Sequence, residues 1–548
     1  MVTKEQLGRL IKSKKTAENN RSIFISLWKE IATIMGLSYG TWTVSSSKNM
    51  KTLADLKDVT DSTMEQSSNL MANGLTGNAF GRSIAWFSLA FEKYDSKKQV
   101  IADWLHEVEK QIYKQCNRSN FYKEARTFLR HGADFGTAVM FFEEWEEEEM
   151  PFFTTLHPKD VCILENRFGV ADTMFRDLFL DKYDAIQKFG EDKIPDIIKN
   201  STDNDKKWQF CQYIGPSKRY DLDVDGTEPY ISVYWCADAK EQTCKEERYS
   251  HKPFVSWRWN RDLEGSAYGT QNPGMQVLSD VKQLCSMTSD VTKLSQLQAA
   301  PPLKKTKGLL INVRPAGVTE LDAGEDFAMA PVTGNLQFTE YERAELRKRI
   351  REAYYSDFFL MLTANQDKKK TATEVAGLLG EKADVMSSFL DGLASEFLEP
   401  TLEFLYENEM KYARLPELPQ ELSALAEEEL DIDFISPLYM LQKRAHSSQN
   451  EMESIANIAG VYAQLNPEIM DNINLDKATR NAMADYNCSH LLVSESERDK
   501  IRKARNDAKA KIAADQSEQA KAMNQAKIYQ LTGKAPEEGS AAASAMGA

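Results

Sequence analysis

The sequence lacks a cysteine framework and any long apolar run. Its seven cysteines are scattered over 548 residues with no C-x-x-C pair, which is typical of free thiols in a reducing compartment and predicts no disulfides. No stretch approaches the roughly eighteen apolar residues of a membrane-spanning helix, and the N-terminus has no apolar run of signal-peptide length. We therefore expect a soluble protein that stays inside the cell and has no membrane partner.

An excess of positive charge is also missing. Lys and Arg number 68 against 83 Asp and Glu, so the formal net charge is −15. Affinity for nucleic acid comes mainly from lysine and arginine neutralising phosphates, so this balance excludes a general DNA-gripping surface and predicts that any DNA contact is local. The hydrophobic content of 42% indicates a folded protein. Its length allows several domains, because single cores stop growing at roughly 250 to 300 residues.

Motifs that carry enzymatic chemistry are absent as well. The six histidines form no H-E-x-x-H or H-x-x-x-H pair, and there is no G-x-S-x-G elbow. Residues 74–83 lack the spacing of a phosphate loop and have Arg82 where its lysine belongs, so we interpret them as a glycine-containing turn before a strand. The acidic run 143–149 predicts an exposed hairpin or loop instead of a magnesium site. We expect no enzyme, no cofactor and no metal.

What is present indicates an α+β protein that is mainly helical. Apolar spacing predicts helices over 22–35, 61–75, 100–115 and 121–129, with extended pieces over 84–91 and 137–143. Between 151 and 259, short alternating runs separated by glycine, proline and charged clusters predict antiparallel strands.

Two long helices then flank a segment of different character. Asn272 and Pro273 are favoured first residues for a helix over 272–300, and an apolar stripe continues to an Ala-Ala-Pro-Pro stop. Thr339 and Glu342 have the spacing of a capping box, which predicts a second helix through Leu362. The intervening residues contain short β-like pieces among glycines and prolines. Their basic side chains are Lys304, Lys305, Lys307 and Arg314.

A second capping box, at Thr371 and Glu374, directly follows the basic run 368–370. It predicts a helix to Phe397 that Pro400 should kink or interrupt. The lysines Lys368, Lys369 and Lys370 either belong to a plain polar turn of a helical hairpin or form a basic loop that meets DNA. A further box at 494–497 predicts a charged helix to about residue 531, followed by a low-complexity end.

Three arginines share one face of the helix that starts at the first capping box. Arg343, Arg347 and Arg351 follow i, i+4, i+8 spacing. They either pair with the neighbouring Glu342, Glu345 and Glu352 on an exposed face, or form a docking surface for an acidic partner or for DNA.

In this order, the parts resemble the portal, or head-to-tail connector, proteins of short-tailed bacteriophages. Ser266, Tyr439 and Met440 depart from the residues that the family often has at those places. The blocks that carry the resemblance are WLHEVEKQIYKQCNRSNFYKEA (104–125), DFGTAVMFFEE (134–144), ENRFGVADTMFR (165–176), RWNRDLEGSAYGTQNPGMQVLSDVKQL (258–284), AAPPL (299–303), TATEV (371–375) and ISPLYMLQKRA (435–445).

The resemblance implies a portal-type subunit in a ring of twelve at the capsid vertex of the virion, assembled in the host cytoplasm. Its implied parts are a wing over 1–271, a stem helix over 272–300, a clip over 301–338, a second stem helix over 339–362, a channel loop over 363–372, a long kinked helix and wing return over 373–437, a crown over 438–493, a C-terminal helix over 494–532 and a disordered tail over 533–548.

The implied function is a non-enzymatic channel for packaging and ejecting double-stranded DNA without sequence specificity. An acidic bore would repel phosphates, and Lys368 to Lys370 would add a basic collar around the axis. Lys304, Lys305, Lys307 and Arg314 would belong to the clip that the packaging motor and the tail contact. Implied partners are the large terminase subunit, the tail adaptor, and the major capsid and scaffolding proteins. A tail adaptor or scaffold is the alternative function, and a packaging nuclease or ATPase is a further one.

Overall fold

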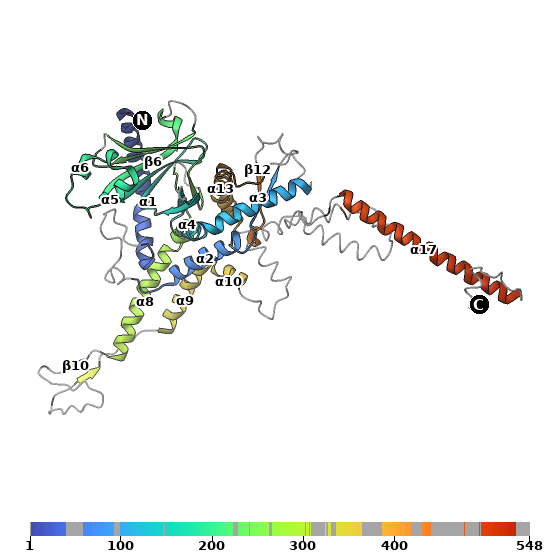
Figure 1. The fold of residues 1–548 in the computed structure, drawn as a ribbon. Helices are drawn as coiled ribbons and strands as arrows, with labels where there is room; N and C mark the ends of the chain where they lie inside the picture. The colour runs from blue at the N-terminus through green and yellow to red at the C-terminus, as the bar shows by residue number, and fades with distance from the viewer. Residues whose placement is uncertain are drawn as a thin grey trace. The chain divides into compact units, whose positions relative to one another are not determined.

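The protein is a mixed α/β chain that divides into two compact units. Unit 1 comprises Met1–Ser88, Val108–Leu415 and Ile432–Glu453, and unit 2 comprises Leu89–Glu107, Pro416–Asp431 and Ser454–Ala548. The computed structural model describes residues 2–39, 59–91, 99–145, 148–222, 228–239, 242–261, 266–301, 303–305, 307, 324, 327–329, 336–363, 386–417, 430–439, 476, 493 and 495–532 (Figure 1).

Unit 1 opens with α1 (Lys4–Ile34), a helix much longer than the one predicted over 22–35. It begins at a capping box in which the backbone amide of Gln6 donates to the Thr3 hydroxyl, and the amide of Thr3 donates to the Gln6 side chain. Lys14 and Arg21 are both buried on its inward face. These long polar residues interrupt the apolar stripe of the sequence, which is why the prediction missed the first half of α1.

The next helices are α2 (Thr63–Ala79), α3 (Gln99–Arg118) and α4 (Phe121–Phe135). The helices α3 and α4 include the helices predicted over 100–115 and 121–129, and α2 overlaps the one predicted over 61–75 but begins two residues later. The turn predicted over 74–83 is wrong in its first half, because α2 continues to Ala79. The strand predicted over 84–91 is β1 (Phe87–Phe91), which pairs with β12 (Leu430–Phe434).

Two antiparallel sheets confirm the strands predicted between 151 and 259. The first has the order β3-β2-β9, and the β2–β3 pair confirms the hairpin predicted at the acidic run. Residues 146 and 147 of that run lie outside the described residues, and Glu143 and Glu144 in β2 are half-buried, not exposed as predicted. The second has the order β4-β5-β6-β7-β8. The strands are β2 (Thr137–Trp145), β3 (Met150–Leu156), β4 (Val161–Glu165), β5 (Ala171–Leu180), β6 (Trp208–Pro216), β7 (Tyr230–Cys236), β8 (Thr243–Tyr249) and β9 (Phe254–Arg258).

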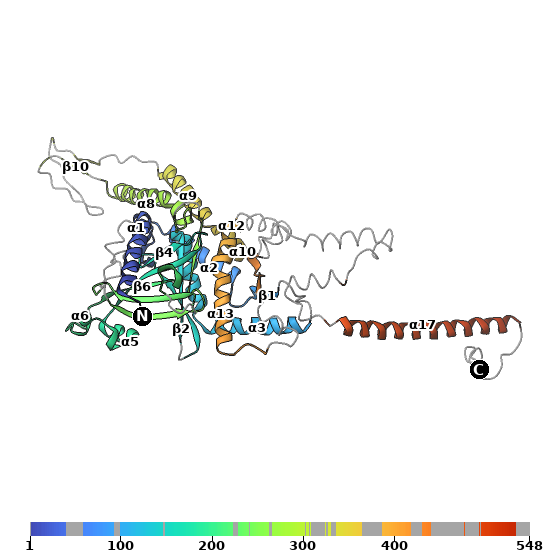
Figure 2. The same ribbon diagram turned by 90° about the horizontal axis from the view of Figure 1, so that it is seen from above.

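The inward face of α1 packs on the five-stranded sheet, and Figure 2 shows the helix beside β4 and β6. Leu7, Leu10 and Ala17 share a buried cluster with Phe175 and Trp235 of the sheet. One guanidinium nitrogen of Arg21 donates to the carbonyls of Lys159 and Val161 at 2.7 and 3.0 Å. The short helices α5 (Lys182–Phe189), η3 (Glu191–Lys193) and α6 (Asp196–Lys199) follow β5, and η4 (Ser217–Tyr220) follows β6.

The chain then forms α7 (Pro273–Gln276) and α8 (Leu278–Ala299), with Asn272 and Pro273 at the predicted N-cap and first helical positions. Strands β10 (Leu303–Lys305) and β11 (Phe327–Met329) pair antiparallel. The next helix, α9 (Leu336–Ala353), begins before Thr339, so the predicted start at that residue is wrong. The helix is also not continuous to Leu362, because it breaks ahead of α10 (Ser356–Thr363).

The helix predicted to reach Phe397 is described from α12 (Ser387–Leu393), and its predicted capping box lies outside the described residues. A π-helical turn, η5 (Ala394–Leu398), leads into α13 (Glu399–Lys411). Pro400 therefore interrupts the regular helix as predicted, since the π-turn accommodates a residue that cannot donate to the preceding turn.

Unit 2 contains α17 (Glu495–Thr532), whose bounds agree with the predicted C-terminal helix. The side chain of Arg502 contacts both carboxylate oxygens of Asp476 at 2.6 Å. No helix in the described part of the chain combines the length and apolar character needed to cross a membrane.

Candidate functional site

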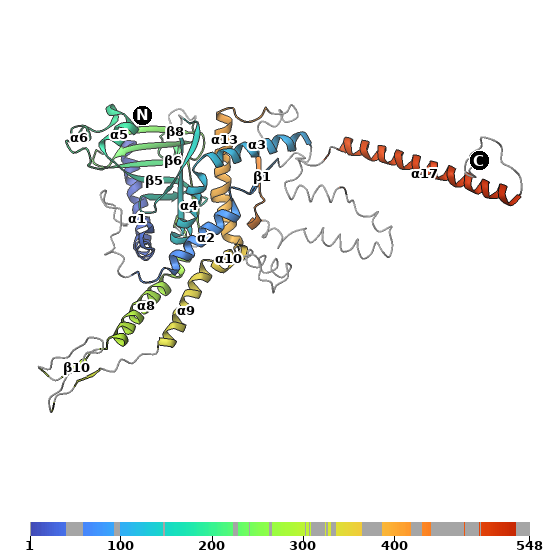
Figure 3. The same cartoon turned by 60° about the horizontal axis from the view of Figure 1, so that its bottom comes forward.

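Helices α8 and α9 lie side by side, as Figures 1 and 3 show. They run antiparallel, because Arg349 near the end of α9 lies 3.6 Å from Asp280 near the start of α8. The short β10–β11 sheet belongs to the segment that connects them. The predicted arrangement of two helices flanking a β-containing segment is therefore present.

Polar contacts clamp the base of this helix pair to α1 and α2. The Arg347 guanidinium donates twice to one carboxylate oxygen of Asp61, at 3.0 and 2.8 Å. On α8, the Lys282 ammonium lies 2.6 Å from a Glu30 carboxylate oxygen. Burial alone would raise the pKa of Asp61, but hydrogen bonds from Thr63 and Arg347 hold it below its ordinary value.

A buried carboxylate, Asp134, ties the end of α9 to three other elements. One of its oxygens accepts from the Tyr354 hydroxyl at 2.9 Å. The other accepts from the hydroxyls of Tyr39 at 2.5 Å and Ser68 at 2.8 Å, and the Arg130 guanidinium lies 3.6 Å away. Asp134 is fully buried, and burial raises its pKa. These bonds satisfy a group that would otherwise be costly to bury, so they hold Tyr354, directly after α9, against α2 and α4.

Beyond the base, the apolar stripe of α8 is only partly covered. Leu278, Val281 and Leu284 are buried, whereas Val291 and Leu294 are half-buried. Farther along, Leu297 is 45% exposed, and Phe338 and Tyr341 at the facing end of α9 are 58% and 66% exposed. The outer part of the pair is thus an apolar surface that this single chain leaves open.

The predicted basic residues fall in different places. Lys304 and Lys305 lie in β10, opposite Ala328 and Phe327 of β11, and Lys307 is exposed. The remaining residues of the two basic groups, Arg314 and Lys368 to Lys370, lie outside the described residues. Their predicted contacts with the motor, the tail and DNA stay predictions.

The three arginines of α9 differ from one another. Arg343 is buried and pairs with Glu340, and Arg347 pairs with Asp61. Arg351 is exposed. Two of the three are therefore engaged within the chain, although their acidic partners are not the glutamates that the sequence suggested. Docking on this face stays a prediction, and of the three only Arg351 is open to it.

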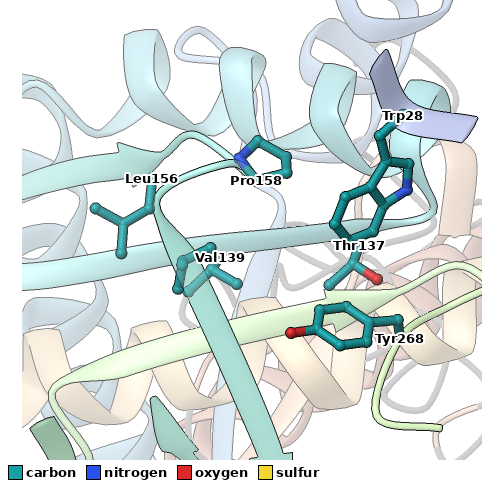
Figure 4. A pocket seen from close by; sticks show the side chains of 7 residues that line it. Trp28, Thr137, Val139, Leu156, Pro158 and Tyr268 are labelled. Atoms are coloured by element: carbon teal, nitrogen blue, oxygen red, sulfur yellow. The ribbon is translucent and has the colours of Figure 1, made fainter. Parts of the chain in front are cut away.

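A small cavity between α1 and the three-stranded sheet is too small for a substrate. Its volume is about 10 Å³, the space of one water-sized sphere. Its lining is Trp28, Thr137, Val139, Leu156, Pro158, Val161 and Tyr268 (Figure 4). Within the described ranges, no group of three or more His, Cys, Asp or Glu residues is arranged to hold a metal ion.

Asp61, Asp134 and Tyr354 were missed by the sequence reasoning. Asp134 had a signal in the sequence, because it is a charged residue between the apolar Ala133 and Phe135. Asp61 had no such signal in the sequence, because an acidic residue just before a helix is explained by capping alone.

Comparison with known proteins gives a consistent result. The family model described as "Bacteriophage head to tail connecting protein" matches residues 7–490. A probable portal protein of Bordetella phage BPP-1 is 24% identical over 476 residues, which is 83% of each chain. The portal protein of Salmonella phage epsilon15 is 24% identical over 491 residues, 86% of this chain and 85% of its own.

Among solved structures, a chain of the neck of an empty GTA particle is similar at a TM-score of 0.32 and 10% identity. The match covers 67% of this chain and 87% of that one. A score this low supports no inference about the fold.

Proposed function

The chain belongs to the bacteriophage head-to-tail connecting protein family, and from this premise we propose that it is a portal subunit that forms a twelve-membered ring at one vertex of the phage head. The ring is a channel through which double-stranded DNA is packaged and later ejected. It also joins the head to the tail, so its partners include capsid and tail proteins.

The observation that carries this proposal is the helix pair α8 and α9. Their base is fixed by Arg347 on Asp61 and Lys282 on Glu30. Their outer part has an apolar stripe that ends in the 45% exposed Leu297. Burying such a stripe is favourable by about 25 cal/mol per Å². Neighbouring copies in a ring would cover it, and the paired helices would then form the stem. A tail adaptor has no need of a β-containing segment held between two long helices.

The charge of the chain supports the channel. With −15 per subunit, a bore lined by many copies repels phosphates and lets DNA move without adhering. Lys368, Lys369 and Lys370 contribute a narrow basic collar that contacts the DNA backbone without reading bases. In this proposal, the collar restrains DNA from sliding back.

The β10–β11 segment is the proposed clip. Lys304, Lys305, Lys307 and Arg314 belong to its sequence, and it is the proposed contact for the large terminase subunit during packaging and for the tail adaptor afterwards. Arg351, near the end of α9 that is farther from this segment, is a second and separate proposed docking position. Scaffolding and major capsid proteins contact the outside of the ring.

Native mass spectrometry of the purified protein tests the proposal. We expect one dominant assembly of twelve times the 62.2 kDa subunit. An exclusively monomeric protein at micromolar concentration, with intact secondary structure by circular dichroism, would refute the ring.

A further inference from the structure

The break between α9 and α10 is not explained by the local sequence. Tyr354 and Tyr355 separate the two helices, and Tyr355 has φ +52°, in the left-handed region that residues with a side chain rarely adopt. Sharp helix bends almost always occur at proline, glycine, π-bulges or inserted groups. Residues 336–363 contain neither glycine nor proline.

The sequence across the break instead favours one continuous helix. Leu346, Ile350, Tyr354, Phe358 and Leu362 follow a four-residue spacing without interruption. In a straight helix, Tyr355 would have ordinary helical dihedral angles. The bent form therefore places one residue in a conformation that costs about 1 to 3 kcal/mol, which the surrounding contacts must offset.

Several contacts hold the bent form. Phe358 is buried, and the rings of Tyr355 and Phe389 lie 6.0 Å apart. The Tyr354 hydroxyl donates to Asp134 at 2.9 Å. The ring of Phe359 lies directly over Gly74 of α2, where a Cβ atom would stand only 2.2 Å from the ring. Tyr354 and Phe359 are both fully buried. Tertiary contacts with α2 and α4 thus impose the bend on a segment that would otherwise be straight.

The contacts of α9 and those of α10 are separable. α9 is anchored on its own by the bond from Arg347 to Asp61. Asp134 keeps its hydrogen bonds from Tyr39 and Ser68 when Tyr354 leaves. Release of Tyr354, Phe358 and Phe359, which are all buried, would therefore straighten the chain after α9 without displacing α9.

We propose that Tyr354 and Tyr355 form a two-position hinge. In one position, α10 is bent away from α9, and the Tyr354 hydroxyl donates to Asp134. In the other, α9 and α10 form one helix. The inference rests on the proposed function for its use: α10 ends at Thr363, five residues before Lys368, so the hinge sets the direction in which the chain leaves toward the loop lysines. Strained residues of this kind occur at switch regions, and packed elements shift between discrete positions.

Tyr355→Gly and Tyr355→Ala form a matched pair that tests the hinge. Both remove the aromatic ring. Glycine adopts the left-handed conformation without penalty and favours the bent form, whereas alanine favours a continuous helix. Between the two variants, the ratio of bent to straight molecules should change on the order of tenfold. Tyr354→Phe removes the hydrogen bond to Asp134 and should also raise the fraction of molecules in which α9 and α10 form one straight helix. Tyr341→Phe makes the same chemical change at an exposed position and is its control.

Spin labels report the hinge position directly. Ala344 and Leu360 are exposed, and cysteines placed there would be about 24 Å apart along a continuous helix, since the rise is about 1.5 Å per residue. Bending shortens this distance. Cys285 and Cys488 are changed to serine, and the other cysteines are buried thiols. Labelled subunits are mixed with excess unlabelled protein, so that few assemblies contain two labelled subunits. Pulsed electron–electron double resonance then measures the distance between the two labels within one subunit.

We expect the unsubstituted hinge and the Tyr355→Gly variant to give mainly the shorter distance. Tyr355→Ala and Tyr354→Phe should add a population near 24 Å, and Tyr341→Phe should not. Identical distances in all variants would overturn the hinge. So would a chain that is fully straight from the outset. If Tyr354→Phe does not fold, the glycine and alanine pair decides.

Counting subunits in the same samples by native mass spectrometry separates the two proposals. Intact rings with invariant distances refute the hinge alone. A monomer refutes the ring, while its distances still report on the hinge.

Discussion

Asp61 illustrates how single residues fix the helix pair. Its carboxylate accepts from the amide of Thr63 at 2.9 Å, at the start of α2, and from the Arg347 guanidinium on α9. The Asp61 side chain is only 6% exposed. A buried carboxylate of this kind is stable only while it is paired, because water no longer solvates it.

Arg347→Ala should therefore lower the free energy of unfolding by about 1 to 3 kcal/mol, since it leaves the buried Asp61 carboxylate without its guanidinium donor. Urea unfolding measures the loss. Lys348→Ala, one position away and 63% exposed, is the control and should change stability by less than about 0.5 kcal/mol. Equal effects of the two substitutions would contradict this role of the ion pair.

Two buried histidines predict sensitivity to acid. Burial lowers the pKa of His131 to about 3 and that of His157 to about 4, and their rings lie 5.9 Å apart. In the unfolded chain, the two histidines bind protons as the pH falls through about 6.5, whereas in the folded chain they remain neutral until a lower pH. The contribution of these two histidines to stability is thus fully present above pH 6.5 and is lost as the pH decreases toward their folded pKa values.

His131→Phe should remove a large part of this sensitivity. His131 alone contributes a loss of about 2 kcal/mol between pH 8 and pH 5, and unfolding curves at both values measure it. Burial raises the pKa of Asp160 to about 6, so protonation of Asp160 increases stability as the pH falls. This effect is the same in the unsubstituted protein and in the His131→Phe variant. His106→Phe, at an exposed position, should keep the full acid dependence. A loss that is the same in both variants would show that His131 is not the cause.

At the scale of elements, the sequence predicted what depends on local pattern. The strands between 151 and 259 alternate in hydrophobicity, and the sheets confirmed them. Asn272 and Pro273 marked the start of α7 because capping is a local effect. The first half of α1 was missed, since Lys14 and Arg21 are buried by partners on the distant five-stranded sheet.

Other features depend on tertiary contacts and were not predictable in this way. Thr339 and Glu342 have capping-box spacing but lie inside α9, because the helix continues toward Leu336. The break at Tyr355 contradicts the local period and depends on Asp134 and Gly74, which are far away in the sequence. For the same reason, the sequence predicted the helix pair of the candidate site but not the residues that anchor it.

The outer part of α8 gives a prediction at this scale. Leu297→Asp places a charge on the open apolar stripe, so it should leave the thermal unfolding of the subunit within about 2 °C while it weakens assembly at least tenfold. Analytical ultracentrifugation over a dilution series measures the assembly. Gln298→Asp adds the same charge beside the stripe and should assemble normally. Unaltered assembly of Leu297→Asp would exclude this stripe from the subunit contact.

For the whole molecule, the proposed ring would depend on net charge and on the position of a few lysines for the passage of DNA. In that ring, subunits of net charge −15 would present a surface to which DNA does not adhere. A short basic run then acts locally, because screening limits its reach to about 10 Å at moderate salt.

Replacing Lys368, Lys369 and Lys370 together with alanine should leave rings intact but reduce the yield of DNA-filled heads severalfold, since the proposed collar no longer holds the packaged DNA. Complementation of a portal-deficient phage, with full and empty heads counted on a density gradient, measures this. Replacing Lys500, Lys503 and Lys509 of α17 removes the same charge elsewhere and is the control. An unchanged yield of full heads would refute the role of the loop.

Electron microscopy of the purified protein would show directly whether the subunits form a portal ring. We expect a closed ring of twelve subunits around an axial channel, with the α8 and α9 pairs of neighbouring copies packed side by side along it. A compact particle of one subunit, or an assembly in which these helices lie away from any central opening, would contradict it.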